Sequence, residues 1–162
     1  MLLENIKIKF GKQLVHSKIL YKSYWRNYGG LSSLISSLYF IGAVLVTIIV
    51  LLFYDSRNAW YDIPISTLPN IIGFAIAGYS ITLTFIIGNE EKFNIDVKKA
   101  ISAAFAHFVF VQALSLFFSI VSKYIGLDGI AFTFIGTLLF TYAIMCIFAT
   151  TIAIYHIGNK KI

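Results

Sequence analysis

Four long stretches of the chain contain no Asp, Glu, Lys or Arg. They hold 28, 27, 23 and 31 residues and lie between Arg26 and Asp55, Asp62 and Glu90, Lys99 and Lys123, and Asp128 and Lys160. An α-helix needs about 20 apolar residues to cross a hydrocarbon core of about 30 Å. A helix also satisfies its own backbone hydrogen bonds, which lipid cannot do. The pattern therefore predicts four transmembrane helices, near 31–53, 68–88, 100–121 and 130–156.

The composition supports the same class. Of the 162 residues, 59% are hydrophobic and 12% are charged, whereas soluble domains carry roughly 25% charged residues. A soluble enzyme, a disordered tail and a disulfide scaffold are therefore excluded. We predict an all-α polytopic membrane protein with a cytoplasmic arm (1–30), one four-helix membrane domain (31–156) and a short cytoplasmic tail (157–162).

The basic residues predict the orientation of the chain. Residues 1–30, the segment 89–99 and the tail together hold 11 Lys and Arg residues, while the other connecting segments hold only Arg57 and Lys123. Cytoplasmic segments retain the excess of Lys and Arg in membrane proteins. We therefore expect both termini and the 89–99 loop to be cytoplasmic, with Trp60 and Tyr61 anchoring an outer loop among the headgroups.

The arm has the pattern of a basic amphipathic helix. On a helical projection its cations occupy one surface, and the opposite arc holds Leu2, Leu3, Ile6, Phe10, Leu14, Leu20, Tyr21, Tyr24 and Tyr28. Such a helix lies in the headgroup plane, so the arm either anchors the bundle or binds a soluble partner. The candidate contacts with lipid or a partner are Lys7, Lys12, Lys18, Lys22 and Arg26 in the arm, and Glu90, Glu91 and Lys92 in the loop. Binding of nucleic acid is not expected, because no aromatic stacking platform interleaves these charges.

The second predicted span carries a stripe of small residues. They are spaced by 4, 3, 4 and 4 and comprise Gly73, Ala77, Ser80, Thr84 and Gly88. Small residues let a neighbouring membrane helix approach closely. The neighbour belongs either to the same chain or to a second copy, and we expect a homo-oligomer.

Polar residues at membrane depth form the remaining candidate site. They are His107, Gln112 and Ser115 in the third span, with Ser119 nearby, and Thr133, Thr137 and Thr141 in the fourth. Intramembrane polar residues usually face the bundle interior. His107 either forms an interhelical hydrogen bond or acts as a protonatable gate. The threonines either bond back to the carbonyls of their own helix or line a polar path.

No motif for catalysis or for metal binding is present. The spans contain no carboxylate, and the sequence has no H-E-x-x-H, P-loop, G-x-S-x-G or clustered Cys and His ligands. We therefore expect no enzyme activity, no cofactor and no metal.

One segment resembles a known group of proteins. Residues 68–81, LPNIIGFAIAGYSI, with GNEEKF at 88–93, resemble small four-span bacterial inner-membrane proteins of anti-phage defence systems, such as the membrane component of Kiwa. The resemblance implies an inner-membrane subunit that acts with a soluble cytosolic partner. The alternatives are a pore-forming effector that depolarises the membrane and, more weakly, a small transporter or flippase.

Overall fold

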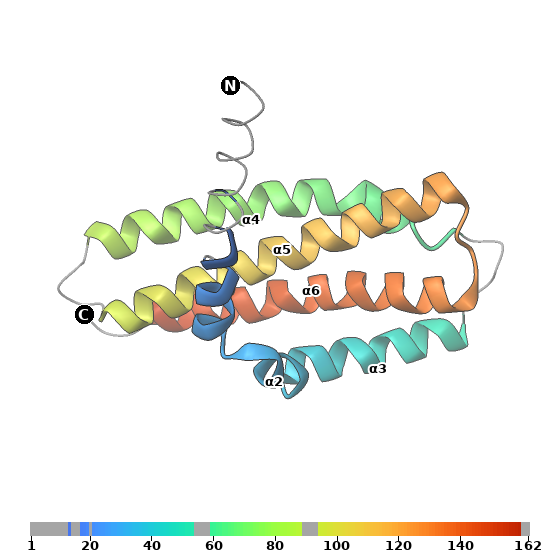
Figure 1. Cartoon of the computed structure of the whole chain (residues 1–162). Coiled ribbons are helices and arrows are strands. Elements are labelled where there is room, and N and C mark those ends of the chain that lie inside the picture. Colours follow the sequence, from blue (N-terminus) through green and yellow to red (C-terminus); the bar gives the residue numbers. More distant parts are fainter. Residues whose placement is uncertain (1–12, 14–16, 20, 54–58, 89–93, 160–162) are drawn as a thin grey trace, which may run out of the picture.

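The computed structural model describes residues 13, 17–19, 21–53, 59–88 and 94–159, and within these ranges the chain is helical with no strand (Figure 1). Three helices are long and apolar enough to span a membrane: α4 (Asp62–Gly88), α5 (Ile95–Ile125) and α6 (Ile130–Asn159). At 1.5 Å per residue, each is about 40 Å long or more. The prediction of an all-helical membrane protein with long apolar helices is therefore confirmed.

The segment predicted as the first span is divided into two helices. These are α2 (Gly30–Ile35) and α3 (Leu38–Leu52). Ser37 between them has extended backbone angles, and its hydroxyl accepts a hydrogen bond from the backbone N–H of Tyr39. This is an N-cap, which starts a new helix. The 15 residues of α3 extend only about 22 Å.

Helix α4, which corresponds to the second predicted span, begins earlier than the hydrophobic pattern predicts. It starts at Asp62 rather than near residue 68. Pro64 lies in its first turn, where the N–H that proline lacks would have no partner within the helix. Pro69 lies inside the helix.

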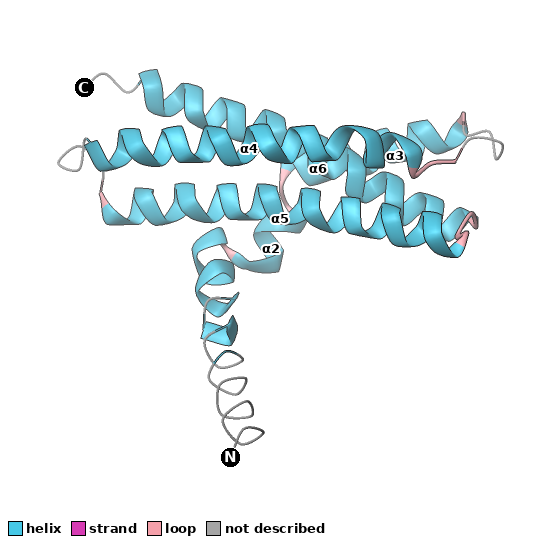
Figure 2. Cartoon of the chain, turned by 90° about the horizontal axis from the view of Figure 1, so that it is seen from above, coloured by secondary structure: helices cyan, strands magenta, loops and turns pink. Residues whose placement is uncertain are grey.

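The helices pack in the spatial order α4, α5, α6, α3 (Figures 1 and 2). α5 and α6 form an antiparallel hairpin that turns at Gly126, whose φ of 76° suits a residue without a side chain. α4 packs on α5 and α3 packs on α6. The hairpin thus forms the centre of the bundle, and the end of the bundle that carries its turn is called the hairpin end below.

The last part of the arm, residues 21–28, is helical and stands across the bundle (Figure 2). Gly29 and Gly30 both have positive φ and separate this helix from α2. The arm helix contacts α5 at His107, well away from either end of α5.

Candidate functional site

The bundle has an unusual distribution of polarity for a folded chain. Large apolar side chains such as Leu38, Phe53, Phe74 and Ile130 are more than three-quarters exposed. Many buried side chains are polar, and those on the central hairpin are His107, Gln112, Ser115, Ser119, Ser122, Thr133 and Thr141. Apolar surface facing outward is expected where the solvent is lipid. The interior polar groups are therefore the candidate functional residues.

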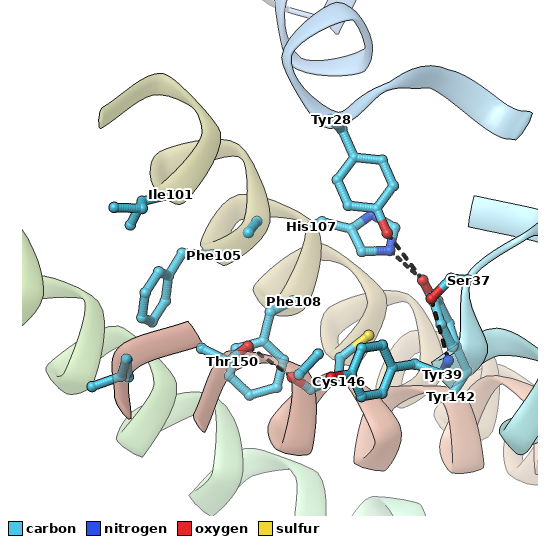
Figure 3. A pocket seen from close by; sticks show the side chains of 13 residues that line it. Tyr28, Ser37, Tyr39, Ile101, Phe105, His107, Phe108, Tyr142, Cys146 and Thr150 are labelled. Carbon is cyan, nitrogen blue, oxygen red and sulfur yellow. Dashed lines mark hydrogen bonds between the residues drawn. The ribbon is translucent and has the colours of Figure 1, made fainter. Parts of the chain in front are cut away.

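The imidazole of His107 joins three segments of the chain. Its Nε2 lies 2.7 Å from the hydroxyl of Tyr142 on α6, and its Nδ1 is bonded to the hydroxyl of Tyr24 on the arm. The ring of Tyr28 stacks on the imidazole with centroids 4.1 Å apart, and Figure 3 shows the two rings beside one another. His107 thus forms an interhelical hydrogen bond, which was one of the two roles that the sequence allowed for it. Tyr24, Tyr28 and Tyr142 with His107 are called the His107 cluster.

The cluster attaches the aromatic face of residues 21–28 to the bundle, and the described cations of the arm remain at the surface. Lys18, Lys22 and Arg26 are exposed. Burial raises the pKa of Tyr24 to about 12, so its hydroxyl keeps its proton at physiological pH. The expected contacts Lys7, Lys12, Glu90, Glu91 and Lys92 lie outside the described residues.

A cavity of about 100 Å³ lies beside the His107 cluster, between α5 and α6. Figure 3 shows Tyr28 and His107 at one side of it and Ile101 and Phe105 at the other. No Asp, Glu, Lys or Arg is among its lining residues. Its walls are mainly apolar, so it suits a hydrocarbon group rather than an ion.

A second group of polar side chains is buried on α5 and α6, between His107 and the hairpin end in the sequence of each helix. We call it the polar row, and it consists of Gln112, Ser115, Ser119 and Ser122 on α5 and Thr133 on α6. The α5 members are spaced by 3, 4 and 3, which places them on one helix face. Each of the five is at most 1% exposed. Ser122 is the member that the sequence analysis missed, although this spacing was a signal for it.

Most of the polar row has no hydrogen-bond partner. Within the described residues, neither amide atom of Gln112 has one, nor do the hydroxyls of Ser115, Ser122 and Thr133. Ser119 donates to the Ser115 carbonyl at 2.8 Å. A buried polar group without a partner costs about 1–3 kcal/mol. Such a row is therefore a candidate binding site for small polar molecules.

The threonines of α6 do not form one continuous path. The Thr141 hydroxyl bonds back to the Thr137 carbonyl at 2.9 Å and lies 2.8 Å from the hydroxyl of Thr47 on α3. Thr141 therefore holds α3 against α6, while Thr133 belongs to the polar row. Thr137 between them is half-buried.

Trp60 packs on the central hairpin near the hairpin end. Its indole is 8% exposed, so it packs against the protein, whereas the sequence predicted that it anchors an outer loop among the headgroups. The indole N–H donates to the Leu127 carbonyl at 3.3 Å, and the ring lies 5.7 Å from that of Phe118. The benzene part of the indole rests on the backbone of Gly136, where a Cβ would overlap it. Only a glycine at this position admits the ring.

The small-residue stripe of α4 faces away from the other helices of the chain. Its members Gly73, Ala77, Ser80, Thr84 and Gly88 are all exposed. The side chains that α4 buries against the bundle include Leu68, Ala75 and Ile86. The sequence allowed a neighbouring helix either in the same chain or in a second copy, and within the described residues no helix of the same chain covers the stripe.

Among the described residues, no group of three or more His, Cys, Asp or Glu side chains could hold a metal ion. Cys146 is a free, buried thiol. The arrangement thus offers neutral hydrogen-bonding groups, one imidazole and a cationic arm.

Comparison of the chain with protein-family models, curated proteins and solved structures finds no match.

Proposed function

We propose that the protein is an integral subunit of a bacterial inner membrane that presents a cationic arm to an acidic, soluble partner in the cytosol. The observation that supports this most is the docking of the arm. Tyr24 and Tyr28 fasten one face of the arm to His107, while Lys18 and Lys22 on the other face remain exposed. Positive charge arranged in this way favours association with a negatively charged surface.

The topology that belongs to this proposal has four spans, with α3 as the shortest. His107 lies 16 residues from Lys123 along α5, which is about 24 Å at 1.5 Å per residue. If Lys123 marks one membrane surface, the arm crosses the bundle near the other, because the hydrocarbon core is about 30 Å thick. The excess of Lys and Arg assigns the arm side to the cytoplasm. There the arm is an interfacial helix.

The setting and assembly of the subunit follow from the resemblance and from α4. The likeness of residues 68–93 to the membrane component of Kiwa supports a role in anti-phage defence. The outward stripe on α4 supports a homo-oligomer, because small residues favour close helix contacts in lipid. In this proposal the oligomer clusters several arms, which strengthens partner binding by raising the effective concentration.

Photo-crosslinking from the arm tests the proposal. A photoreactive residue at Ile19, which is 61% exposed, should crosslink a soluble protein that mass spectrometry identifies. Reversing Lys18, Lys22 and Arg26 to Glu should abolish this crosslink and leave the thermal unfolding of the protein in detergent unchanged. Lys123→Glu, which breaks an exposed ion pair with Asp62 at the opposite end of the bundle, is the control for charge reversal elsewhere and should keep the crosslink. An equal crosslink in the triple variant contradicts the proposal.

A second candidate function is a conduit through the membrane. It is favoured by the unpartnered polar row inside the bundle, since polar groups that face a membrane protein's interior often mark a pathway. Ion release from liposomes that contain the purified protein tests it, and protein that releases none contradicts it.

A further inference from the structure

The cavity beside the His107 cluster is long and narrow. Along α5 its wall runs from Ile101 to Phe108, which is about 10 Å at 1.5 Å per residue. Its volume is only about 100 Å³, less than the roughly 150 Å³ of an apolar cavity that holds one benzene molecule. A space of this length and volume suits a single hydrocarbon chain better than a ring, and it is partly open to the surroundings.

The polar groups in the cavity wall are bonded within the protein. The Thr150 hydroxyl donates to the Cys146 carbonyl at 2.7 Å, and the imidazole of His107 is bonded to Tyr142 and Tyr24. Within the described residues, no buried side-chain polar atom of the lining lacks a hydrogen-bond partner. A polar ligand would therefore lose its hydrogen bonds to water without replacement. The wall selects a ligand part without polar atoms.

The cavity lies where α3 stops covering α6 (Figure 1). Gly42 lies beside Met145 and Thr47 beside Thr141, so the two helices are antiparallel. At this register α3 begins about ten residues before the end of α6. The α6 wall of the cavity continues past that point to Ile154, which is 41% exposed. This end of the wall is therefore in contact with the surroundings of the bundle.

The surroundings at this depth are the acyl chains of phospholipids. If Lys123 marks one membrane surface, a hydrocarbon core of about 30 Å reaches to about residue 103 of α5. The cavity extends from Ile101 to Phe108, so it lies at the cytoplasmic edge of the hydrocarbon layer. A free fatty acid suits it less, because no Lys or Arg lines the cavity to pair with a carboxylate.

We propose that the cavity binds one acyl chain of a phospholipid and that the bound chain stabilises the docked arm, a role that rests on the membrane topology given above but not on a soluble partner. Tyr28 of the arm forms part of the wall and stacks on His107. A chain in the cavity therefore contacts Tyr28 only while the arm is docked. A ligand that binds one of two states better shifts the equilibrium toward that state.

Photolabelling tests the site in full-length protein in liposomes. The probe is phosphatidylethanolamine with a diazirine midway along one acyl chain, and mass spectrometry locates the adducts. Phe105, Phe108 and Cys146 line the cavity and are only 4%, 5% and 6% exposed. Lipid on the outer surface of the bundle does not reach such side chains. We therefore expect adducts on them from a chain inside the cavity.

Filling the cavity should remove these buried adducts. Ala104→Phe adds a ring to the cavity wall, and Ala106→Phe adds the same ring at another exposed position of α5 that does not line the cavity. We expect a roughly tenfold loss of buried adducts with Ala104→Phe, because a displaced chain forfeits the burial of about two methylene groups. Ala106→Phe should cause no loss. Ala149→Phe, on the α6 wall, is the second cavity-filling variant if Ala104→Phe does not fold.

Two results would overturn the site. One is equal labelling of the buried side chains in the folded cavity-filling variant and in Ala106→Phe, and the other is the absence of buried adducts in the unaltered protein. A diazirine fatty acid at the same mole fraction distinguishes the source of the chain. Labelling by the phospholipid, with or without labelling by the fatty acid, supports the proposal, whereas labelling by the fatty acid alone contradicts it.

Trypsin cleavage tests the coupling to the arm. Phosphatidylethanolamine added to delipidated protein in detergent should slow cleavage after Lys22 and Arg26 several-fold. Ala106→Phe should respond in the same way, and Ala104→Phe should not respond. Equal slowing in both variants contradicts the coupling. No soluble partner takes part in this measurement, so its failure leaves the partner proposal standing, and loss of the partner crosslink leaves the lipid site standing.

Discussion

At the scale of single residues, His107 joins the arm, α5 and α6 in the bundle interior. It is 5% exposed, and both of its ring nitrogens are bonded to tyrosine hydroxyls. A neutral imidazole carries one donor and one acceptor, and hydroxyl groups can complement both. The ring can therefore remain uncharged inside the membrane with its hydrogen bonds complete.

Removing one of these hydroxyls should destabilise the fold measurably. In Tyr142→Phe the Nε2 atom loses its partner in a buried site, and we expect a loss of about 1–3 kcal/mol. Thermal unfolding in detergent measures this loss. Tyr155→Phe removes the same atom from an exposed ring on the same helix and should have almost no effect. If the two variants unfold alike, the cluster does not stabilise the bundle.

At the scale of elements, the connection between the arm and α3 is built from special backbone positions. Gly29 and Gly30 have φ values of 100° and 78°, in the region that side chains disfavour. Ser37 then caps α3. The hydrophobic run 31–53 predicts a single helix, but these capping residues turn the chain instead and direct the arm across the bundle.

A side chain at Gly30 should disturb the placement of the arm. A Cβ there would meet nothing within 4 Å, so the effect of Gly30→Ala comes from the backbone alone, about 1–2 kcal/mol. We expect faster trypsin cleavage after Lys22 and Arg26, because undocking relieves the strain. Gly126→Ala has nearly the same φ and equally open surroundings at the other end of the bundle, and it serves as the control. Equal cleavage of both variants would argue against a backbone hinge at Gly30.

At the scale of the whole molecule, the row of four helices is open at both sides. α3 and α4 each pack mainly on one neighbour, so each presents a wide surface to its surroundings. On α4 that surface includes the exposed stripe from Gly73 to Gly88. In the proposed oligomer a second copy covers this stripe.

Bulky residues on the stripe should separate the copies without unfolding them. A Cβ at Gly73 would meet nothing within 4 Å in the chain itself, and Ala77 is exposed. We therefore expect Gly73→Leu with Ala77→Leu to lower the mass of the detergent-solubilised particle, measured by light scattering, with unchanged helix content. Phe74→Leu changes an exposed side chain beside the stripe and should leave the mass unchanged. A monomeric wild-type particle would contradict the oligomer directly.

The charge-free runs by themselves predicted apolar helices near 68–88, 100–121 and 130–156, and the structure is helical over all three ranges. A helix of that length and composition is stable in lipid whatever its neighbours are. The polar residues His107, Gln112, Ser115 and Thr133 could also be selected from sequence, because polar groups at membrane depth are rare.

The partners of these residues were decided only by the tertiary structure. Helical spacing places residues on a face, but which faces meet depends on how all the helices pack. Packing brought Tyr24 and Tyr142 to the two sides of His107 and directed the α4 stripe outward. It also placed Trp60 on Gly136, 76 residues apart in the sequence. A ring and a glycine that are complementary in shape leave no periodic signal along the chain.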